Sequence, residues 1–390
     1  MGSRVRVAVI ITGLGVGGTE LSLLSLLEHI DRSRYECDVI CLYDEDNRLI
    51  PRFLALGIHV TVIKLFDYTK PPFFKYSRYG FLQLVHLLRK NRYDVVHTIL
   101  PQANRSGAVA ALLAGIRAIV STVCNMAPVP PRGVYRALDR MLGNRGYATV
   151  CKSPALLEYD RRIRNLPLDK YRVIYNGADT EHFNPRRIRS SRREILGLPV
   201  DAFVIGSVGR LHAQKAFATL IEAYAIVARR LGNVKLVIAG DGAQRAELEQ
   251  LAGDLGVAGG VVFLGLREDI PEVLSCLDVF ALASLYEGHP NAVVQAMSME
   301  LPVVMTDIPP AHDVLIPGET GVIVPLRSAA AMAAAIEELL VDEARRRSLG
   351  AKARQAVVER FSIRRMVREY EQLYTECARI REYSLKGVTA

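Results

Sequence analysis

Short apolar runs alternate with amphipathic stretches along the whole chain. Residues 4–11 form a β-rich apolar run, and residues 19–30 repeat leucine at the spacing of one helical face. Helical stretches such as residues 80–91 separate further strand-like runs. These runs are residues 35–43, 59–65, 93–100, 117–123, 148–153 and 171–177. Strands that alternate with helices predict a parallel sheet covered by helices on both faces.

The same alternation starts again after a polar, basic stretch at residues 184–194. We therefore predict two doubly wound α/β domains, residues 1–185 and residues 201–362, with residues 186–200 as the linker. The last helix, within residues 363–390, is expected to cross back to the first domain, with an extension of the second domain as the alternative. Ligands of such sheets bind beyond the carboxyl ends of the strands, so the expected site is a cleft between two facing domains.

The composition excludes several classes of protein. Half of the 390 residues are hydrophobic and 23% are charged, which indicates a globular chain and not a disordered one. Six scattered cysteines without a CxxC pair favour reduced thiols over a disulfide frame or a zinc site. The apolar run near the start is short and ends in glycines, so we interpret it as a buried strand, and no run of 18 apolar residues follows.

The formal net charge of +9 lies entirely in the first half of the chain. Residues 1–185 carry 25 basic and 16 acidic residues, whereas residues 186–390 carry 25 of each. This asymmetry predicts an anionic partner, such as lipid headgroups, nucleic acid or a phosphorylated acceptor, and the alternative is a solvated basic surface. Arg132, Arg136 and Arg140 are spaced four residues apart, which suits a helix at a membrane surface. The alternative is an amphipathic helix packed on its sheet.

Two motifs near the start are weaker signals than they look. Residues 13–18 match the G-x-G-x-x-G dinucleotide fingerprint and, taken alone, indicate an NAD-dependent oxidoreductase. Gly17 and Gly18 open a helix, so the loop predicts a bound phosphate more firmly than it predicts NAD. Asp44 and Asp46 resemble a metal-binding pair, but they lie in a polar loop without a second acidic cluster, and we predict no metal there.

The second half carries a different set of candidate residues. Arg210 and Lys215 follow a strand and Gly209, and two cations in such a loop suit a diphosphate, although exposed surface bases are the plain alternative. Gly240 and Gly242 permit a second tight turn at the same sheet edge.

Several motifs in sequence order together resemble those of the family 4 retaining glycosyltransferases, which have the GT-B fold. They are GGTE (17–20), VIYNGADTEHFNP (173–185), GRLHAQKAF (209–217), LVIAGDG (236–242), LYEGHPNAVVQAMSMELPVV (285–304) and GVIVP (321–325). The terminal stretch RFSIRRMVREYEQLY resembles the crossing-back helix of that family. The resemblance covers nearly the whole chain. It implies two Rossmann-like domains that face a central cleft, and it implies that the donor substrate is a nucleotide sugar.

The resemblance also implies roles for single residues. Arg210 and Lys215 would grip the donor diphosphate, and Glu287 would face the donor sugar or its phosphate. Helix-start N–H groups and glycines would complete the donor site: Asn291, Ala292, Val293, Gly17, Gly18, Gly209, Gly240 and Gly242. Gln295 stands where the family has a second acid that holds the ribose. An amide keeps one hydrogen bond there, weaker by about 1–2 kcal/mol than that of a carboxylate.

Besides Gln295, four positions depart from the family pattern. His97 is expected to position the sugar, or else to be a packed histidine at a strand end, but the second histidine of that motif is Ile99. Cys124 stands where a histidine is common, and Ala216 and Glu300 replace glycines.

The sequence thus predicts a metal-independent retaining transferase without a cofactor. It would move a hexose-type sugar from a nucleotide-diphosphate donor to a lipid-linked or cell-envelope glycan acceptor. The expected location is cytoplasmic, at the inner face of an anionic membrane, with no nucleic acid as partner. The alternatives are a degenerate sugar-nucleotide-binding subunit, motivated by the departures, and an NAD-dependent oxidoreductase, which leaves the second half unexplained.

Overall fold

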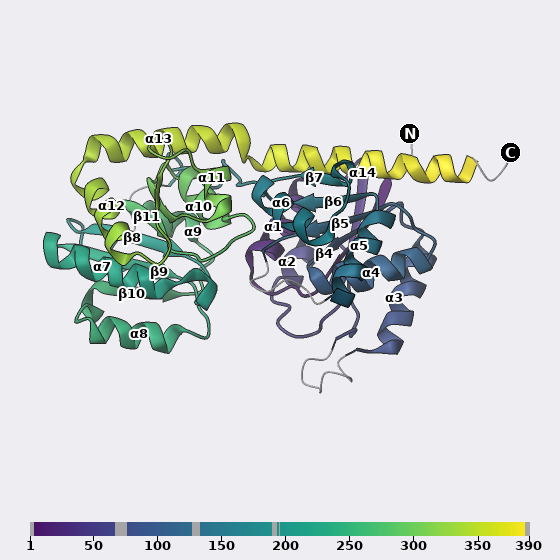
Figure 1. Ribbon diagram of the computed structural model, residues 1–390, viewed down its shortest axis with the longest axis horizontal. Coiled ribbons are helices and arrows are strands. Elements are labelled where there is room, and N and C mark those ends of the chain that lie inside the picture. The colour runs from purple at the N-terminus through teal and green to yellow at the C-terminus, as the bar shows by residue number, and fades with distance from the viewer. Residues whose placement is uncertain (1–3, 67–75, 127–132, 189–192, 195, 387–390) are drawn as a thin grey trace. The chain divides into compact units, whose positions relative to one another are not determined.

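A computed structural model describes residues 4–66, 76–126, 133–188, 193–194 and 196–386 (Figure 1). The chain divides into two compact units, a first unit of Met1–Asn176 with Ile363–Ala390 and a second unit of Gly177–Ser362. The division falls after Asn176, ahead of the predicted boundary at residue 185, and the stretch predicted to be a linker belongs to the second unit.

Arg193 explains why this stretch belongs to a compact unit. Its guanidinium lies 2.8 Å from a carboxylate oxygen of Asp278 and donates to the carbonyl oxygens of Val200, Ala202 and Cys276 at 2.9–3.0 Å. These bonds fasten the segment to the strand region around Asp278.

In its described residues the first unit has a seven-stranded parallel sheet in the order β3-β2-β1-β4-β5-β6-β7. The strands are β1 (Val5–Ile11), β2 (Tyr35–Cys41), β3 (Val60–Val62), β4 (Val95–Ile99), β5 (Ile119–Val123), β6 (Ala148–Cys151) and β7 (Tyr171–Val173). Alternate side chains of β1 enter two different cores, with Val7 and Val9 in one and Ala8 and Ile10 in the other. A strand buried on both faces has a continuous apolar sequence, as residues 7–11 do.

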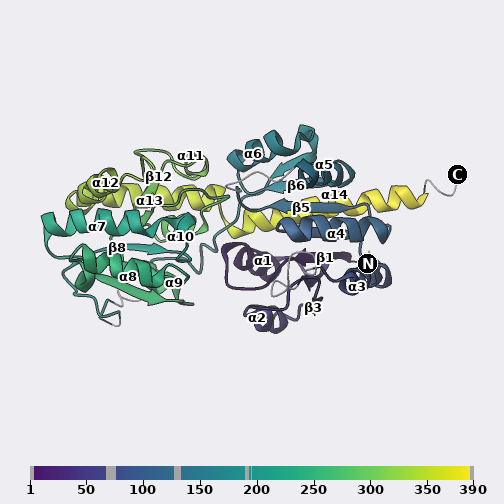
Figure 2. The ribbon, with the colours of Figure 1, turned by 60° about the horizontal axis from the view of Figure 1, so that its bottom comes forward.

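Helices cover both faces of this sheet (Figure 2). They are α1 (Gly18–His29), α2 (Ile50–Ala55), α3 (Arg78–Asn91), α4 (Pro101–Leu113), α5 (Gly133–Arg145), α6 (Pro154–Arg164) and α14 (Ile363–Lys386). The last helix, α14, packs on the same face as α1 through side chains at helical spacing: Ile363, Met366, Val367, Tyr370, Leu373, Tyr374 and Cys377. No helix in the described part of the chain is long and apolar enough to cross a membrane.

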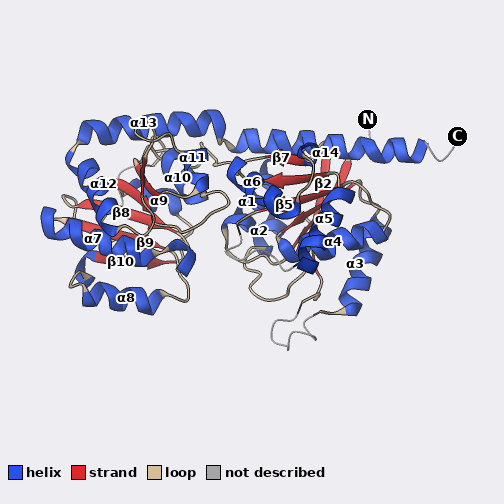
Figure 3. Cartoon of the chain, viewed as in Figure 1, coloured by secondary structure: helices blue, strands red, loops and turns tan. Residues whose placement is uncertain are grey.

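The second unit repeats the plan with a six-stranded parallel sheet in the order β10-β9-β8-β11-β12-β13, again counted over its described residues. Figure 3 shows the strands in red and the helices in blue. Its strands are β8 (Phe203–Val208), β9 (Val234–Ala239), β10 (Val261–Gly265), β11 (Val279–Leu282), β12 (Val303–Thr306) and β13 (Val322–Val324). Its helices are α7 (Phe217–Leu231), α8 (Arg245–Asp254), α9 (Ile270–Ser275), α10 (Asn291–Ser298), α11 (Pro309–Val314), α12 (Ala329–Val341) and α13 (Glu343–Arg360). The predicted α/β class with two doubly wound parallel sheets is confirmed.

Two of the positions where the family pattern has glycine keep a left-handed backbone. Ala216 has φ +47° between the short 3₁₀ helix Ala213–Lys215 and α7, and Glu300 has φ +59° after α10. Glycine adopts this conformation freely, whereas a residue with a Cβ atom is destabilised there by about 1–2 kcal/mol. Tertiary packing therefore holds both turns against a local preference.

We expect Ala216→Gly to raise the free energy of unfolding by about 1 kcal/mol, because it removes the Cβ clash of the left-handed conformation. The urea midpoint measures the change. Ala213→Gly is the matched control, and it should lower stability because Ala213 lies in the 3₁₀ helix and has no positive φ. A lower midpoint for Ala216→Gly would contradict the assigned strain.

Candidate active site

Two glycine-containing turns in the second unit pack backbone against backbone. The turn after β8 and the turn after β9 approach so closely that a Cβ atom on Gly240 would lie within 1.9 Å of the Gly209 carbonyl oxygen. A Cβ atom on Gly242 would lie 2.4 Å from the Leu211 carbonyl oxygen. The Leu211 N–H donates to the Asp241 carbonyl oxygen at 2.9 Å and joins the two turns. Three of the predicted donor-site glycines thus shape one sheet edge.

Lys215 and Glu287 form an ion pair beside these turns. Lys215 Nζ lies 2.5 Å from Glu287 Oε1, and the same oxygen accepts a hydrogen bond from Ser284 Oγ at 2.7 Å. Only 6% of Glu287 is exposed. The Gln214 side chain donates to the Tyr286 carbonyl oxygen at 2.8 Å, so the loop after β8 is tied to the loop after β11. The positive charge of Lys215 is therefore compensated within the protein.

Arg210 differs from Lys215 in having an exposed side chain. No hydrogen bond or ion pair holds its guanidinium within the described residues. Its charge, one residue beyond Gly209, is therefore open to a ligand at this sheet edge.

The start of α10 offers fewer donors than the sequence suggests. The N–H of Asn291 donates to the His289 carbonyl oxygen at 3.0 Å, and that of Val293 donates to the Pro290 carbonyl oxygen at 2.9 Å. Among the three predicted N–H groups, only that of Ala292 has no acceptor in the described part of the chain. Gln295 is half-buried one turn further along α10.

Gly17 and Gly18 lie in the first unit, at the start of α1. Gly17 is the N-cap with extended backbone angles, and Gly18 is the first helical residue. A Cβ atom on Gly17 would lie 2.4 Å from a carboxylate oxygen of Glu20. The negative end of Glu20 therefore lies at the helix N-terminus, where the sequence predicted a phosphate.

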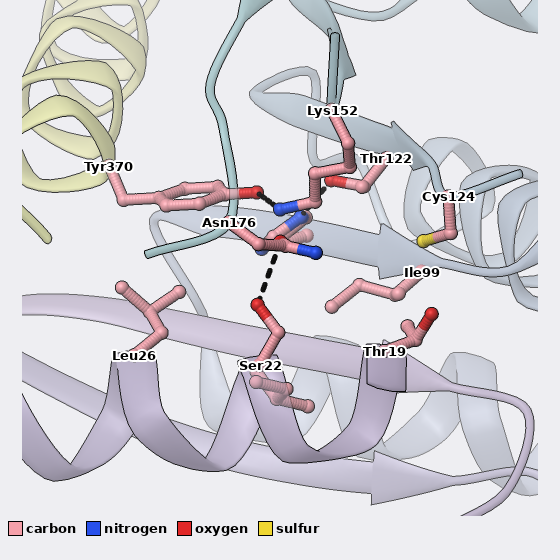
Figure 4. A pocket seen from close by; sticks show the side chains of 11 residues that line it. Thr19, Ser22, Leu26, Ile99, Thr122, Cys124, Lys152, Asn176 and Tyr370 are labelled. Atoms are coloured by element: carbon pink, nitrogen blue, oxygen red, sulfur yellow. Dashed lines mark hydrogen bonds between the residues drawn. The ribbon is translucent and has the colours of Figure 1, made fainter. Parts of the chain in front are cut away.

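A small pocket lies at the carboxyl ends of β4, β5 and β6 in the first unit (Figure 4). Its volume is about 20 Å³. The strands bring together residues that are far apart in the sequence, and α1, α14 and the segment after β7 close the pocket. The lining residues are Thr19, Ser22, Leu23, Leu26, His97, Ile99, Thr122, Cys124, Lys152, Asn176 and Tyr370.

His97 lies in the wall of this pocket with both ring nitrogens engaged. Its Nδ1 atom is 2.7 Å from the Tyr374 hydroxyl oxygen, and its Nε2 atom is 2.7 Å from Thr122 Oγ1. Burial, together with the nearby charge of Lys152, lowers the pKa of His97 to about 3, so the ring is neutral at physiological pH. A neutral imidazole has one donor and one acceptor, and both are used here. This geometry favours the packed histidine over a sugar-positioning one.

Two other predicted features, the acidic pair Asp44 and Asp46 and the described arginines of residues 132–140, belong neither to the Lys215–Glu287 region nor to the first-unit pocket. Asp44 pairs with Lys64, and Asp46 pairs with Arg48, so each acid already has a cation. The described residues contain no group of three or more histidine, cysteine or acidic side chains able to hold a metal ion. Two of the three predicted arginines, Arg136 and Arg140, are exposed on α5. Arg132 lies outside the described residues.

The sequence analysis did not identify four residues of the two candidate sites. Gln214 and Ser284 carry no distinctive motif, and Tyr370 reaches the pocket only through the folding of α14. Lys152 did carry a signal, because it follows the apolar run 148–151 directly, as Arg210 follows a strand. A cation immediately after a parallel strand marks the sheet edge where ligands bind.

Comparison with known proteins gives the family. The model of the glycosyltransferase family 4 matches residues 16–182, and the model of the glycosyl transferases group 1 matches residues 189–356. The lipopolysaccharide core biosynthesis glycosyltransferase LpsE of Rhizobium meliloti is 31% identical over 294 residues, which are 75% of this chain and 78% of that protein. The chain belongs to the family 4 glycosyltransferases. The predicted resemblance is confirmed.

Other relatives extend the picture. An Escherichia coli UDP-Gal:α-D-GlcNAc-diphosphoundecaprenol α-1,3-galactosyltransferase is 35% identical over 240 residues, a match that spans 58% of this chain and 61% of that enzyme. The crystal structure of Anabaena HepE in complex with UDP-glucose has a TM-score of 0.83 at 23% identity, and the match covers 95% of this chain and 99% of HepE. At this identity the structural likeness shows the GT-B fold alone.

Proposed function

We propose that this family 4 glycosyltransferase transfers a hexose-type sugar, with retention of configuration, from a nucleotide-diphosphate donor. The acceptor is a lipid-linked or cell-envelope glycan. The names of the relatives support this assignment, because one acts on a diphosphoundecaprenol-linked sugar and another serves lipopolysaccharide core biosynthesis. The function requires no protein nucleophile, metal or cofactor.

The observation that carries the proposal is the arrangement of charge at the carboxyl edge of β8. Lys215 is held by the buried Glu287, while Arg210 keeps an uncompensated charge one residue past Gly209. Departure of a nucleoside diphosphate concentrates negative charge on the phosphate oxygens, and positioned cations stabilise such charge most in the transition state. Lys215 and Arg210 then share the leaving group, while Glu287 keeps the lysine in place.

Retention follows from attack on the face that the diphosphate leaves. The bond between the anomeric carbon and the phosphate oxygen breaks, and the acceptor hydroxyl oxygen bonds to the same face of the sugar. The departing phosphate takes the hydroxyl proton. This step conserves atoms and charge and uses His97 only as part of the fold.

The first unit supplies a candidate membrane surface on α5. Val134 is 80% exposed and Tyr135 is half-exposed on the helix that also carries the exposed cations Arg136 and Arg140. Apolar side chains beside cations suit the headgroup region of an anionic bilayer. We include peripheral binding at the cytoplasmic face in the proposal, because a lipid-linked acceptor is presented there.

The donor assay tests the function. Purified protein should bind a member of a UDP-, GDP- and ADP-sugar panel in a thermal-shift screen and then hydrolyse or transfer that sugar, with an α-configured product from an α-configured donor by NMR. Arg210→Ala should lower turnover a hundredfold or more, because a transition-state charge contact is lost. Its exposed side chain forms no hydrogen bond or ion pair in the described chain, so folding should be unchanged.

Two controls sharpen this assay. Arg229→Ala removes another exposed cation of the second unit and should leave turnover unchanged. Lys215→Met strands the buried Glu287 charge, so it is compared with Lys215→Met/Glu287→Gln, in which no charge is stranded. Near-normal turnover in Arg210→Ala and in the double variant would remove the mechanism. Sugar-nucleotide binding without any turnover would support the alternative of a degenerate binding subunit.

Gln295→Glu should tighten binding of the free nucleoside diphosphate or leave it unchanged, because a carboxylate makes a stronger hydrogen bond to ribose than an amide does. Calorimetric titration measures the change, and Gln295→Ala should weaken binding. A tenfold loss in Gln295→Glu would mean that the pocket is built around an amide.

Membrane binding should depend on the α5 arginines. In vesicle sedimentation, the wild type should bind anionic but not neutral vesicles, and binding should fade as salt rises. Arg136/Arg140→Gln should weaken it about thirtyfold, since each cation contributes about 1 kcal/mol near such a surface.

Arg161/Arg162→Gln on the neighbouring α6 is the matched control, with the same charge change on arginines that each pair with Glu158. It should sediment like the wild type. Equal losses of vesicle binding in both variants would mean that net charge, and not the α5 surface, determines binding. No loss in either variant would mean that α5 is a solvated helix face.

A further inference from the structure

Lys152 is a buried lysine without an acidic partner. Only 6% of the residue is exposed. Its Nζ atom donates one hydrogen bond, to the Tyr370 hydroxyl oxygen at 2.7 Å, and lies 4.9 Å from the centre of the same ring (Figure 4). No aspartate or glutamate of the described chain forms an ion pair with it.

The surroundings of Lys152 do not neutralise its charge. None of the residues that line the pocket is acidic, and His97 is neutral at physiological pH. Thr19 and Ser22 line the pocket from the first turns of α1, whose N-terminus already has the Glu20 carboxylate beside it. Lys152 is therefore the charged side chain among the residues that line the pocket, and one side of the pocket is polar.

Buried charges in proteins are normally paired, because an isolated ammonium loses several kcal/mol of hydration when it leaves water. An ammonium has three donors, and Tyr370 accepts from one of them. The other two have no acceptor within the described residues. This arrangement suits the binding of an anion, in contrast to that of Lys215, which Glu287 compensates.

We propose that Lys152 binds one negatively charged oxygen of a phosphate or carboxylate group on the acceptor. The pocket volume of about 20 Å³ admits a single oxygen-sized group, so the rest of the phosphate or carboxylate lies outside it. The inference deepens the proposed function and rests on it only in assigning the anion to the acceptor.

Methyl NMR of the full-length protein tests the site locally. Ile99 lines the pocket, and its δ1 methyl signal, assigned with Ile99→Val, reports binding there. The probes are inorganic phosphate, methyl phosphate and acetate, without nucleotide sugar and in an Arg210→Ala background, so that the open cation of the second unit does not compete. We expect a saturable shift of the Ile99 signal and at least a tenfold weaker affinity in Lys152→Met.

Lys90→Met removes an exposed lysine from α3 of the same unit and should leave the shift unchanged. Lys152→Gln repeats the test with a polar side chain, and unchanged nucleotide affinity shows that each variant is folded. Equal phosphate affinity in wild type and both Lys152 variants, or no Ile99 shift with any probe, would overturn the site. Binding of inorganic phosphate but not of methyl phosphate or acetate would overturn its assignment to the acceptor. Each result stands whether or not sugar transfer is observed.

Discussion

Because every strand of either sheet runs parallel to its neighbours, each loop that leaves a carboxyl end emerges at one edge beside the loops of the adjacent strands. In the second unit this edge joins the turns after β8, β9 and β11, and thereby brings Lys215 to Glu287. In the first unit it joins the ends of β4, β5 and β6 and forms the pocket around Lys152. Both candidate sites are consequences of strand direction and order.

The two lysines, Lys215 and Lys152, differ in how their charge is balanced. Lys215 has a carboxylate at 2.5 Å that is itself held by Ser284, so the loop is stable without a ligand. Lys152 has only a phenol and an aromatic face. A cation whose partner is built in is a fixed part of the site, and in the proposed function Lys215 shares the leaving group with the open Arg210. A cation without a built-in partner gains most from an external anion.

The sequence predicted the periodic elements well, since strands buried on both faces and amphipathic helices leave clear patterns. It named Arg210, Lys215 and Glu287 from motifs, but the contact between Lys215 and Glu287 joins loops 72 residues apart in the chain. The contact between Lys152 and Tyr370 spans 218 residues, and no local pattern reports such a distance. The boundary at Asn176 was missed because the basic stretch after residue 184 looks like a linker, whereas Arg193 fastens it to Asp278.

Departures from the family pattern fall into two physical kinds. Ala216 and Glu300 change the residue but keep the left-handed backbone, so the turns retain their course at a cost in stability. Ile99 and Cys124 change the chemistry of the pocket, because an apolar side chain and a thiol stand where the pattern has imidazoles. With His97 neutral and bonded on both sides, Lys152 is the charged side chain left in the pocket wall. A pocket whose one imidazole is neutral and fully hydrogen-bonded, and whose wall carries a lysine, is suited to holding an anion in place. It is poorly suited to moving a proton, which agrees with a mechanism in which the leaving phosphate takes the acceptor proton.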